Sequence, residues 1–201
     1  MHTTSFITKT VHVHDASIKV GDQVVYEGEK DEPFAIFAKQ AFKYLEVDYP
    51  KFYKMDALSK MAFLGAEYIL QSEEKEGLAL VLANRSGSLD TDVRHQQSIQ
   101  DTTNIFPSPA TFVYTLSNIC LGEISIRHQL QTENAFFVFE EYPADFMQKY
   151  ADYLLVSAKA KRVLCGWVEY FQEKYRAVLY LVDQNGQKPH TTENINELFE
   201  S

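Results

Sequence analysis

The stretch Pro107 to Leu130, PSPATFVYTLSNICLGEISIRHQL, decides the predicted fold, because it changes from a β-like run to a helical pattern within a few residues. Its first part, Thr111 to Tyr114, is β-branched or aromatic and predicts a short buried strand. The inner positions of the helix that follows are spaced by three and four residues: Ile119, Gly122, Ile126 and Leu130. Many α/β enzymes place a nucleophile at such a junction, and here the turn holds Ser117.

Ser117 is therefore the candidate nucleophile. At the start of a helix, free N–H groups and the positive end of the dipole stabilise a thiolate or an oxyanion. The alternative is that the serine hydroxyl caps the first turn of the helix by accepting a backbone N–H. A hydroxyl is far less acidic than a thiol and needs an adjacent base to attack a thioester, and the sequence shows no such base beside Ser117.

Outside this stretch, the chain predicts alternating strands and helices. Strands are expected at 6–14, 24–26, 77–84, 135–139, 162–170 and 177–182, and helices at 34–45, 58–69, 90–100 and 144–158. Asp56 is the expected N-cap of the second helix, and a polar tail follows the Asn185-Gly186 turn. This alternation predicts an α/β fold with a mostly parallel mixed sheet and helices on both faces.

Composition excludes several classes of protein. With 201 residues, 45% of them hydrophobic, the chain can bury one core, and we expect a single domain over 1–201. The formal net charge of −9 and the pI near 5.1 argue against nucleic-acid binding. No apolar run is long enough for a membrane span, and Met1 to Phe6 shows no leader pattern. Two cysteines in apolar surroundings, Cys120 and Cys165, fit a reducing cytoplasm.

Three segments together carry a resemblance to a known family. Thr115-Leu116-Ser117 aligns with the Thr-Ala-Cys sequence that carries an acyl-accepting cysteine, and Leu164 to Glu169 looks like the strand end Ala-Gly-Gly-x-Glu, with Cys165 in place of a glycine. Asp48 to Asp56 matches further upstream. The chain thus resembles the N-terminal half of β-ketoacyl synthases, of the thiolase-like superfamily. It is most similar to the short ketosynthase-like proteins of aryl-polyene and flexirubin-type pathways.

The resemblance implies half of a thiolase-like fold without the machinery for condensation. A complete ketosynthase has a second half that supplies two catalytic histidines, whereas this chain ends at Ser201 and its His190 lies in a polar segment. The expected role is that of a chain-length-factor-like partner of a full-length ketosynthase in fatty-acid or polyene synthesis, without cofactor or metal. Acyl carrier protein is a further expected partner. Family members dimerise through the strand before the nucleophile, here Phe112, Val113 and Tyr114, so a homodimer is the alternative assembly.

Two other functions stay open. The first is an acyl transferase or thioesterase that uses Ser117, and the second is a self-associating scaffold without acyl ligands. Two groups of basic residues are candidate docking patches, although solvation is the default for such side chains: Lys51, Lys54 and Lys60, and Lys159, Lys161 and Arg162. The loop Asn84 to Ser88 lacks the ending of a phosphate-binding loop. His12 and His14 share one strand face without a third metal ligand, and we expect that face to be solvated.

Overall fold

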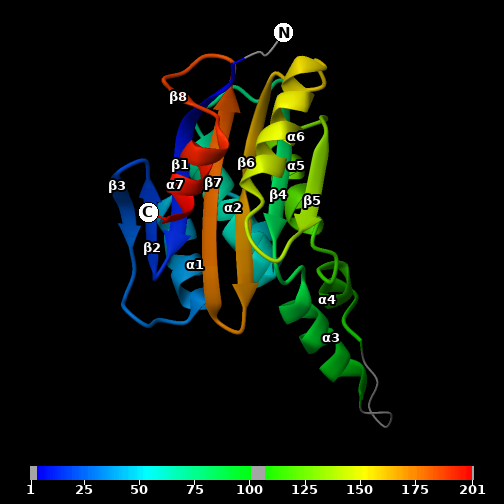
Figure 1. Cartoon of the computed structure of the whole chain (residues 1–201). Helices are drawn as coiled ribbons and strands as arrows, with labels where there is room; N and C mark the ends of the chain where they lie inside the picture. Colours follow the sequence, from blue (N-terminus) through cyan, green and yellow to red (C-terminus); the bar gives the residue numbers. More distant parts are fainter. Residues whose placement is uncertain (1–3, 101–106, 201) are drawn as a thin grey trace.

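A computed structural model describes residues 4–100 and 107–200. Met1 to Thr3, where the sequence shows no leader pattern, lie outside the described residues. The strands form one sheet in the order β3-β2-β1-β7-β6-β4-β5, with β8 beside β1 (Figure 1). Their bounds are Phe6–His14 (β1), Ser17–Val20 (β2), Gln23–Glu27 (β3), Leu78–Asn84 (β4), Asn134–Val138 (β5), Arg162–Phe171 (β6), Lys174–Asp183 (β7) and Lys188–Pro189 (β8).

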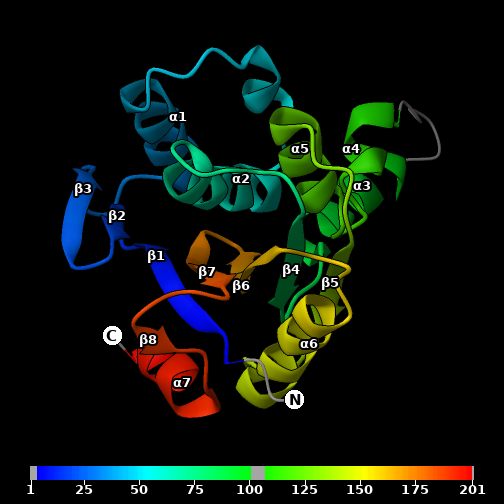
Figure 2. The same cartoon turned by 90° about the horizontal axis from the view of Figure 1, so that it is seen from above.

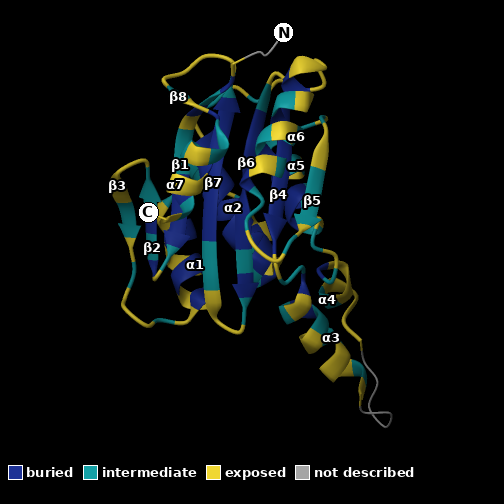
Figure 3. Cartoon of the chain, in the orientation of Figure 1, coloured by how far each residue is buried: buried dark blue, intermediate teal, exposed yellow. Residues whose placement is uncertain are grey.

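The sheet is mixed, as predicted, but its parallel part is limited to the two pairs that β4 forms, so most of the described strand pairs are antiparallel. Strand β4 pairs in parallel with β5 and β6, whereas the pairs from β6 to β3 are antiparallel. All seven residues of β4 are buried, as the continuous apolar run predicts (Figure 3). Gln172 and Glu173 both have positive φ and close the hairpin between β6 and β7, as a two-residue type I′ turn requires.

Three helices cover one face of the sheet (Figure 2): α1 (Phe34–Tyr44), α2 (Ala57–Leu70) and α5 (Ile119–His128). The predicted N-cap of α2 is confirmed, because the Asp56 carboxylate accepts a hydrogen bond from the Ser59 backbone N–H at 2.9 Å. Gly65 allows α2 to lie close to the sheet, since a Cβ at this position would be 2.6 Å from Leu179 Cδ1. The predicted helices at 34–45 and 58–69 are thereby confirmed.

The opposite face is covered by α6 (Ala144–Val156) and α7 (Thr192–Glu200) (Figure 2). The polar tail predicted after the Asn185-Gly186 turn is wrong, because α7 buries Ile195 and Leu198 against the sheet. These two apolar residues are three positions apart on one helix face. Thr191 Oγ1 accepts the Asn194 backbone N–H at 3.3 Å and starts this short amphipathic helix.

The strand predicted at Thr111 to Tyr114 is also wrong. Pro109–Val113 forms the short helix α4, which packs against α3 (Leu89–Gln100) beyond the lower end of the sheet (Figure 1). Helix-start signals overcome the β propensity: Pro109 occupies the first turn, and Ser108 Oγ accepts the Thr111 N–H at 3.2 Å. Pro50–Lys54 forms a further 3-10 helix, η1, before α2.

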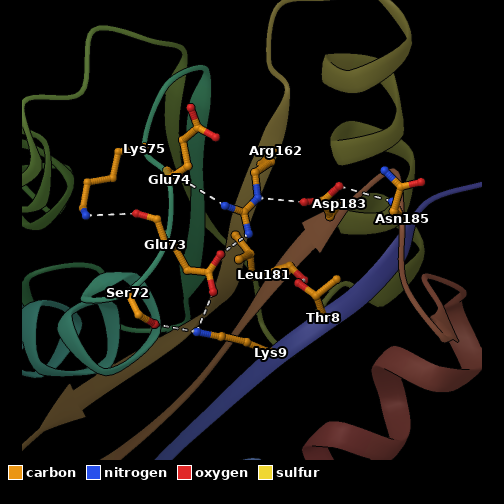
Figure 4. Close-up of polar contacts among 10 residues, drawn as sticks. All are labelled: Thr8, Lys9, Ser72, Glu73, Glu74, Lys75, Arg162, Leu181, Asp183 and Asn185. Atoms are coloured by element: carbon orange, nitrogen blue, oxygen red, sulfur yellow. Dashed lines mark hydrogen bonds and ion pairs between the residues drawn. The ribbon is translucent and has the colours of Figure 1, made fainter.

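A network of charged side chains fastens the α2–β4 connection to the sheet (Figure 4). Arg162 lies 2.5 Å from Glu73 and 2.8 Å from Asp183, and Lys9 of β1 lies 2.5 Å from the same Glu73 carboxylate. The network joins β1, β6 and β7 at one end of the sheet. In the described part of the chain, no helix has the length and apolar character needed to cross a membrane.

Candidate functional site

Ser117 lies in the turn between two helices, α4 and α5, and does not follow a strand. It does not cap α5 either, because the N-cap position is Asn118, which makes no side-chain capping hydrogen bond. The Ser117 hydroxyl faces Gly87, where an added Cβ would lie 3.2 Å from the hydroxyl oxygen and 4.0 Å from Val138. Ser117 therefore sits beside the end of β5, in a context that neither reading of the sequence predicts.

The surface hollow at Ser117 has a volume of about 490 Å³. It is lined by residues of the α4–α5 turn and of β5: Thr115, Leu116, Ser117, Asn118, Asn134, Ala135, Phe136 and Val138. Among the described residues, the lining of this hollow contains no histidine, carboxylate or lysine. No described histidine, carboxylate or lysine side chain forms a hydrogen bond with the Ser117 hydroxyl. Nothing in this lining raises the nucleophilicity of the hydroxyl.

A strand-to-helix junction of the predicted kind does occur between β5 and α6. The predicted strand and helix at 135–139 and 144–158 are both confirmed there. The connection, Phe139 to Pro143, contains no serine or cysteine. Its Tyr142 hydroxyl is bonded to the Tyr180 hydroxyl at 2.8 Å, and burial raises the pKa of Tyr142. This junction supplies an open strand edge beside a helix start, without a serine or cysteine.

The loop after β4 has no free backbone donors for a phosphate at its start. Glu169 accepts the N–H groups of Arg85 and Ser86 at 2.7 and 3.2 Å. The Asn84 side chain bonds to both backbone groups of Gly87 at 2.8 Å. The carboxylate thus occupies the position that an anion would need, and the loop serves to hold the end of β4.

Both cysteines are buried and free. Burial raises the pKa of the Cys120 and Cys165 thiols, which disfavours the thiolate form. Cys120 Sγ donates to the Ser117 carbonyl at 3.1 Å. The prediction that both cysteines serve as small core residues is confirmed, and neither is a nucleophile at neutral pH.

The histidines do not form a metal centre in the described residues, which contain no cluster of three suitable ligands. His190 is buried, and its Nδ1 lies 3.3 Å from Ser5 Oγ and 3.7 Å from Asp152. It fastens the β8–α7 segment to α6. The expectation of a solvated face at His12 and His14 is wrong for His12, which is only 5% exposed. Burial lowers the pKa of His12 to about 4.

The three residues predicted to form a dimer strand have different surroundings. Phe112 and Val113 are exposed on α4, whereas Tyr114 is buried and donates a hydrogen bond to Glu123 at 2.9 Å. The strands at the two edges of the sheet are β3 and β5. The predicted dimer strand at residues 112–114 is therefore wrong as a strand, since α4 ends at Val113 and these residues lie at neither edge of the sheet.

The two basic groups also differ. Lys159, Lys161 and Arg162 are paired with Glu133, Glu76 and Glu73. In the first group, Lys51 is paired with Glu123 at 2.9 Å. Lys54 and Lys60 instead line a cavity of about 290 Å³, which we call the Lys60 cavity.

The Lys60 cavity lies between α1, η1, α2, α3, α4 and the β6–β7 turn. Its charged lining comprises Lys54, Asp56, Lys60, Asp90, Arg94 and Glu173, and its aromatic lining comprises Phe34, Tyr114 and Tyr170. The sequence analysis missed this cavity because its residues come from six segments that no local pattern connects. Lys54 and Lys60, already noted as part of a basic group, were the one available signal.

No protein-family model matches this chain, and no curated protein sequence does. Solved structures do match. The ishigamide ketosynthase/chain length factor has a TM-score of 0.67 and 18% identity, with 92% of this chain and 64% of that chain covered. A structure of a ketosynthase (ApeO) with its chain length factor (ApeC) from Xenorhabdus doucetiae has a TM-score of 0.62 and 15% identity, covering 98% and 90%.

A third match is a type II polyketide ketosynthase in complex with its acyl-carrier protein, AntDE:AntF. Its TM-score is 0.58 and its identity 11%, with 90% of this chain and 62% of that chain covered. The chain spans less than two thirds of the ishigamide and AntDE:AntF chains, but nearly the whole length of the matched Xenorhabdus chain. The predicted thiolase-like half-fold is confirmed, and the chain has the fold of ketosynthase and chain length factor structures.

Proposed function

We propose that this chain is a non-catalytic, chain-length-factor-like partner of a full-length ketosynthase in the type II synthesis of a fatty-acid-like or polyene product. The observation that carries the proposal is the open edge of β5. An edge strand presents unpaired N–H and C=O groups that can pair with another chain. The match over 98% of this chain to a chain from a ketosynthase–chain length factor complex supports the same role, since the two chains are similar in length.

Exposed apolar side chains accompany this edge. Val138 of β5 is 58% exposed, and Leu116, which lines the same hollow, is 56% exposed. On α4, Phe112 and Val113 are 60% and 44% exposed. Such side chains next to an open strand edge favour a protein partner, because burying them stabilises a complex by removing apolar area from water.

The chemistry at Ser117 agrees with a non-catalytic role. The hollow beside the hydroxyl provides no base, so no observation favours the acyl transferase or thioesterase alternative. Acyl carrier protein enters the proposal as the partner of the assembled pair. We expect the pair to act in the cytoplasm, where the two free cysteines stay reduced.

Co-purification tests this proposal. The tagged chain is coexpressed with the ketosynthase encoded nearest to it, and we expect one ketosynthase chain to be recovered per tagged chain. The double variant Leu116→Lys/Val138→Lys should recover at most about a tenth as much, since two charges would be desolvated in the contact. Val24→Lys is the matched control, because Val24 is 53% exposed on β3, the opposite edge strand.

Two outcomes would contradict the proposal. The first is that wild type recovers no ketosynthase while remaining folded. The second is that the β3 control loses the ketosynthase as readily as the β5 double variant does. If wild type binds no ketosynthase but forms a homodimer that Leu116→Lys/Val138→Lys dissociates, the scaffold alternative replaces the proposed role.

A further inference from the structure

The Lys60 cavity has no role in the proposed assembly, yet it lies where α/β folds often bind ligands. It is bordered by Tyr170, in the last part of β6, and by Asp90, in the first turn of the helix that follows β4. β4 and β6 are parallel neighbours, so the cavity is at the carboxyl ends of these strands. Ligands of open α/β sheets bind at this end.

The three carboxylates of the cavity are already engaged in holding its walls together. Asp56 accepts the Ser59 N–H and the Thr91 hydroxyl, both at 2.9 Å, and thereby joins α2 to α3. Asp90 accepts the Gln172 N–H at 3.1 Å. Glu173 accepts the Phe34 N–H at 2.8 Å and the Tyr170 hydroxyl at 2.9 Å. The carboxylates keep their charge, but their oxygens are directed to these donors, and the only ion pair among the described charged residues of the cavity is the long Arg94–Asp90 contact of 3.9 Å.

The three cationic side chains of the cavity, Lys54, Lys60 and Arg94, have N–H donors that form no short ion pair with the described carboxylates. Among the described residues, no carboxylate oxygen lies within 4.0 Å of the Lys54 or Lys60 ammonium group. Arg94 has long contacts only, 3.3 Å to Thr91 and 3.9 Å to Asp90, although a guanidinium has five N–H donors. Burial lowers the pKa of Lys60, and the Arg94 charge lowers it further, while Asp56 acts in the opposite direction.

We propose that the Lys60 cavity binds a phosphate group, held by Lys54, Lys60 and Arg94. Three cations that reach one cavity from η1, α2 and α3 suit a tetrahedral dianion better than a single carboxylate, which two donors satisfy. The volume of about 290 Å³ holds a phosphate with a short organic substituent, for which Phe34 and Tyr114 supply an apolar wall. This inference does not depend on the proposed ketosynthase partner.

Titration of the isolated full chain, followed by amide NMR, tests the site. Sulfate is the first probe, because it mimics the phosphate dianion and does not titrate near neutral pH. We expect saturable shifts at the amides of Asp56 to Lys60 and of Asp90 to Arg94, with a Kd on the order of 1 mM or tighter. Lys60→Met and Arg94→Gln should each weaken binding by about tenfold, whereas Lys43→Met, an exposed lysine on α1, should leave it unchanged.

Two further ligands identify the chemical group that the site binds. Phosphopantetheine binding more tightly than sulfate would assign the site to a carrier-protein arm, and equal binding would assign it to a free phosphate. Octanoate binding more tightly than both would overturn the proposal in favour of a carboxylate site. The proposal is also overturned if sulfate and inorganic phosphate cause no saturable shift, or if Lys60→Met and Arg94→Gln, shown to be folded by their amide spectra, bind as wild type does.

Discussion

The Tyr114 hydroxyl donates a hydrogen bond to Oε1 of Glu123 at 2.9 Å, and both residues are buried. Lys51 Nζ lies 2.9 Å from the other oxygen of the same carboxylate. These two contacts join the end of α4 and η1 to α5. Tyr114 therefore acts inside the monomer, while its neighbour Phe112 is free to contact a partner.

Tyr114→Phe should lower the free energy of unfolding by about 2 kcal/mol, because the buried Glu123 carboxylate loses a donor. Phe112→Ser should change it by less than about 0.5 kcal/mol, since Phe112 is 60% exposed, but should weaken assembly with a ketosynthase. Urea denaturation and co-purification measure the two effects. Loss of assembly in a folded Tyr114→Phe variant would contradict this division of roles.

Ile195→Asp should destabilise the protein by at least about 3 kcal/mol, because Ile195 is fully buried where α7 meets the sheet. Asn196→Asp is the matched control, one position along on the exposed side of the helix, and should change stability by less than about 0.5 kcal/mol. Thermal and urea unfolding compare the two variants. Equal stability of both would restore the polar-tail interpretation of the C-terminal segment.

The lowered pKa of His12 predicts that the folded protein loses stability in mild acid. Its pKa is lowered to about 4 in the folded protein, below the unfolded value of 6.5, so that only the unfolded state takes up the proton between these values. Stability should fall by about 2 kcal/mol between about pH 7 and about pH 5 from this residue alone. The difference between the unfolding curves of wild type and His12→Gln isolates the effect, and parallel pH profiles would refute it.

Ser117→Ala should leave folding, ketosynthase binding and product formation close to wild type, because the hydroxyl has no base beside it in the described hollow. Product analysis in the reconstituted pathway measures this. Mass spectrometry after incubation of wild type with acyl thioesters should show no adduct on Ser117. A covalent adduct, or loss of product from a folded and assembled Ser117→Ala protein, would show that Ser117 takes part in the chemistry and would contradict the non-catalytic role.

Much of the fold was predictable because its signals are local. The buried run of β4 and the capped, periodic helix α2 follow from neighbouring residues. The run from Thr111 to Tyr114 misled because Ser108 and Pro109, just before it, start a helix that overrides the β propensity of the side chains. In α7, two apolar residues in a polar segment were too weak a signal until the sheet beneath them was known.

The candidate sites were less predictable, since each depends on contacts between distant segments. Ser117 was correctly placed just before a helix, but its position relative to β5 and Gly87 follows from tertiary packing. An edge strand was predicted at residues 112–114, which form no strand, because which strand lies at the edge is a property of the whole sheet. The Lys60 cavity brings together residues as far apart as Phe34 and Glu173.

Residue-resolved hydrogen exchange of the chain, free and bound to its ketosynthase, tests the central claim most directly. The account predicts that β5 amides not bonded to β4 exchange at least about tenfold more slowly in the complex, while amides on the β3 edge do not change. A complex that forms without added protection in Asn134–Val138, or that protects Gln23–Glu27 instead, would contradict it.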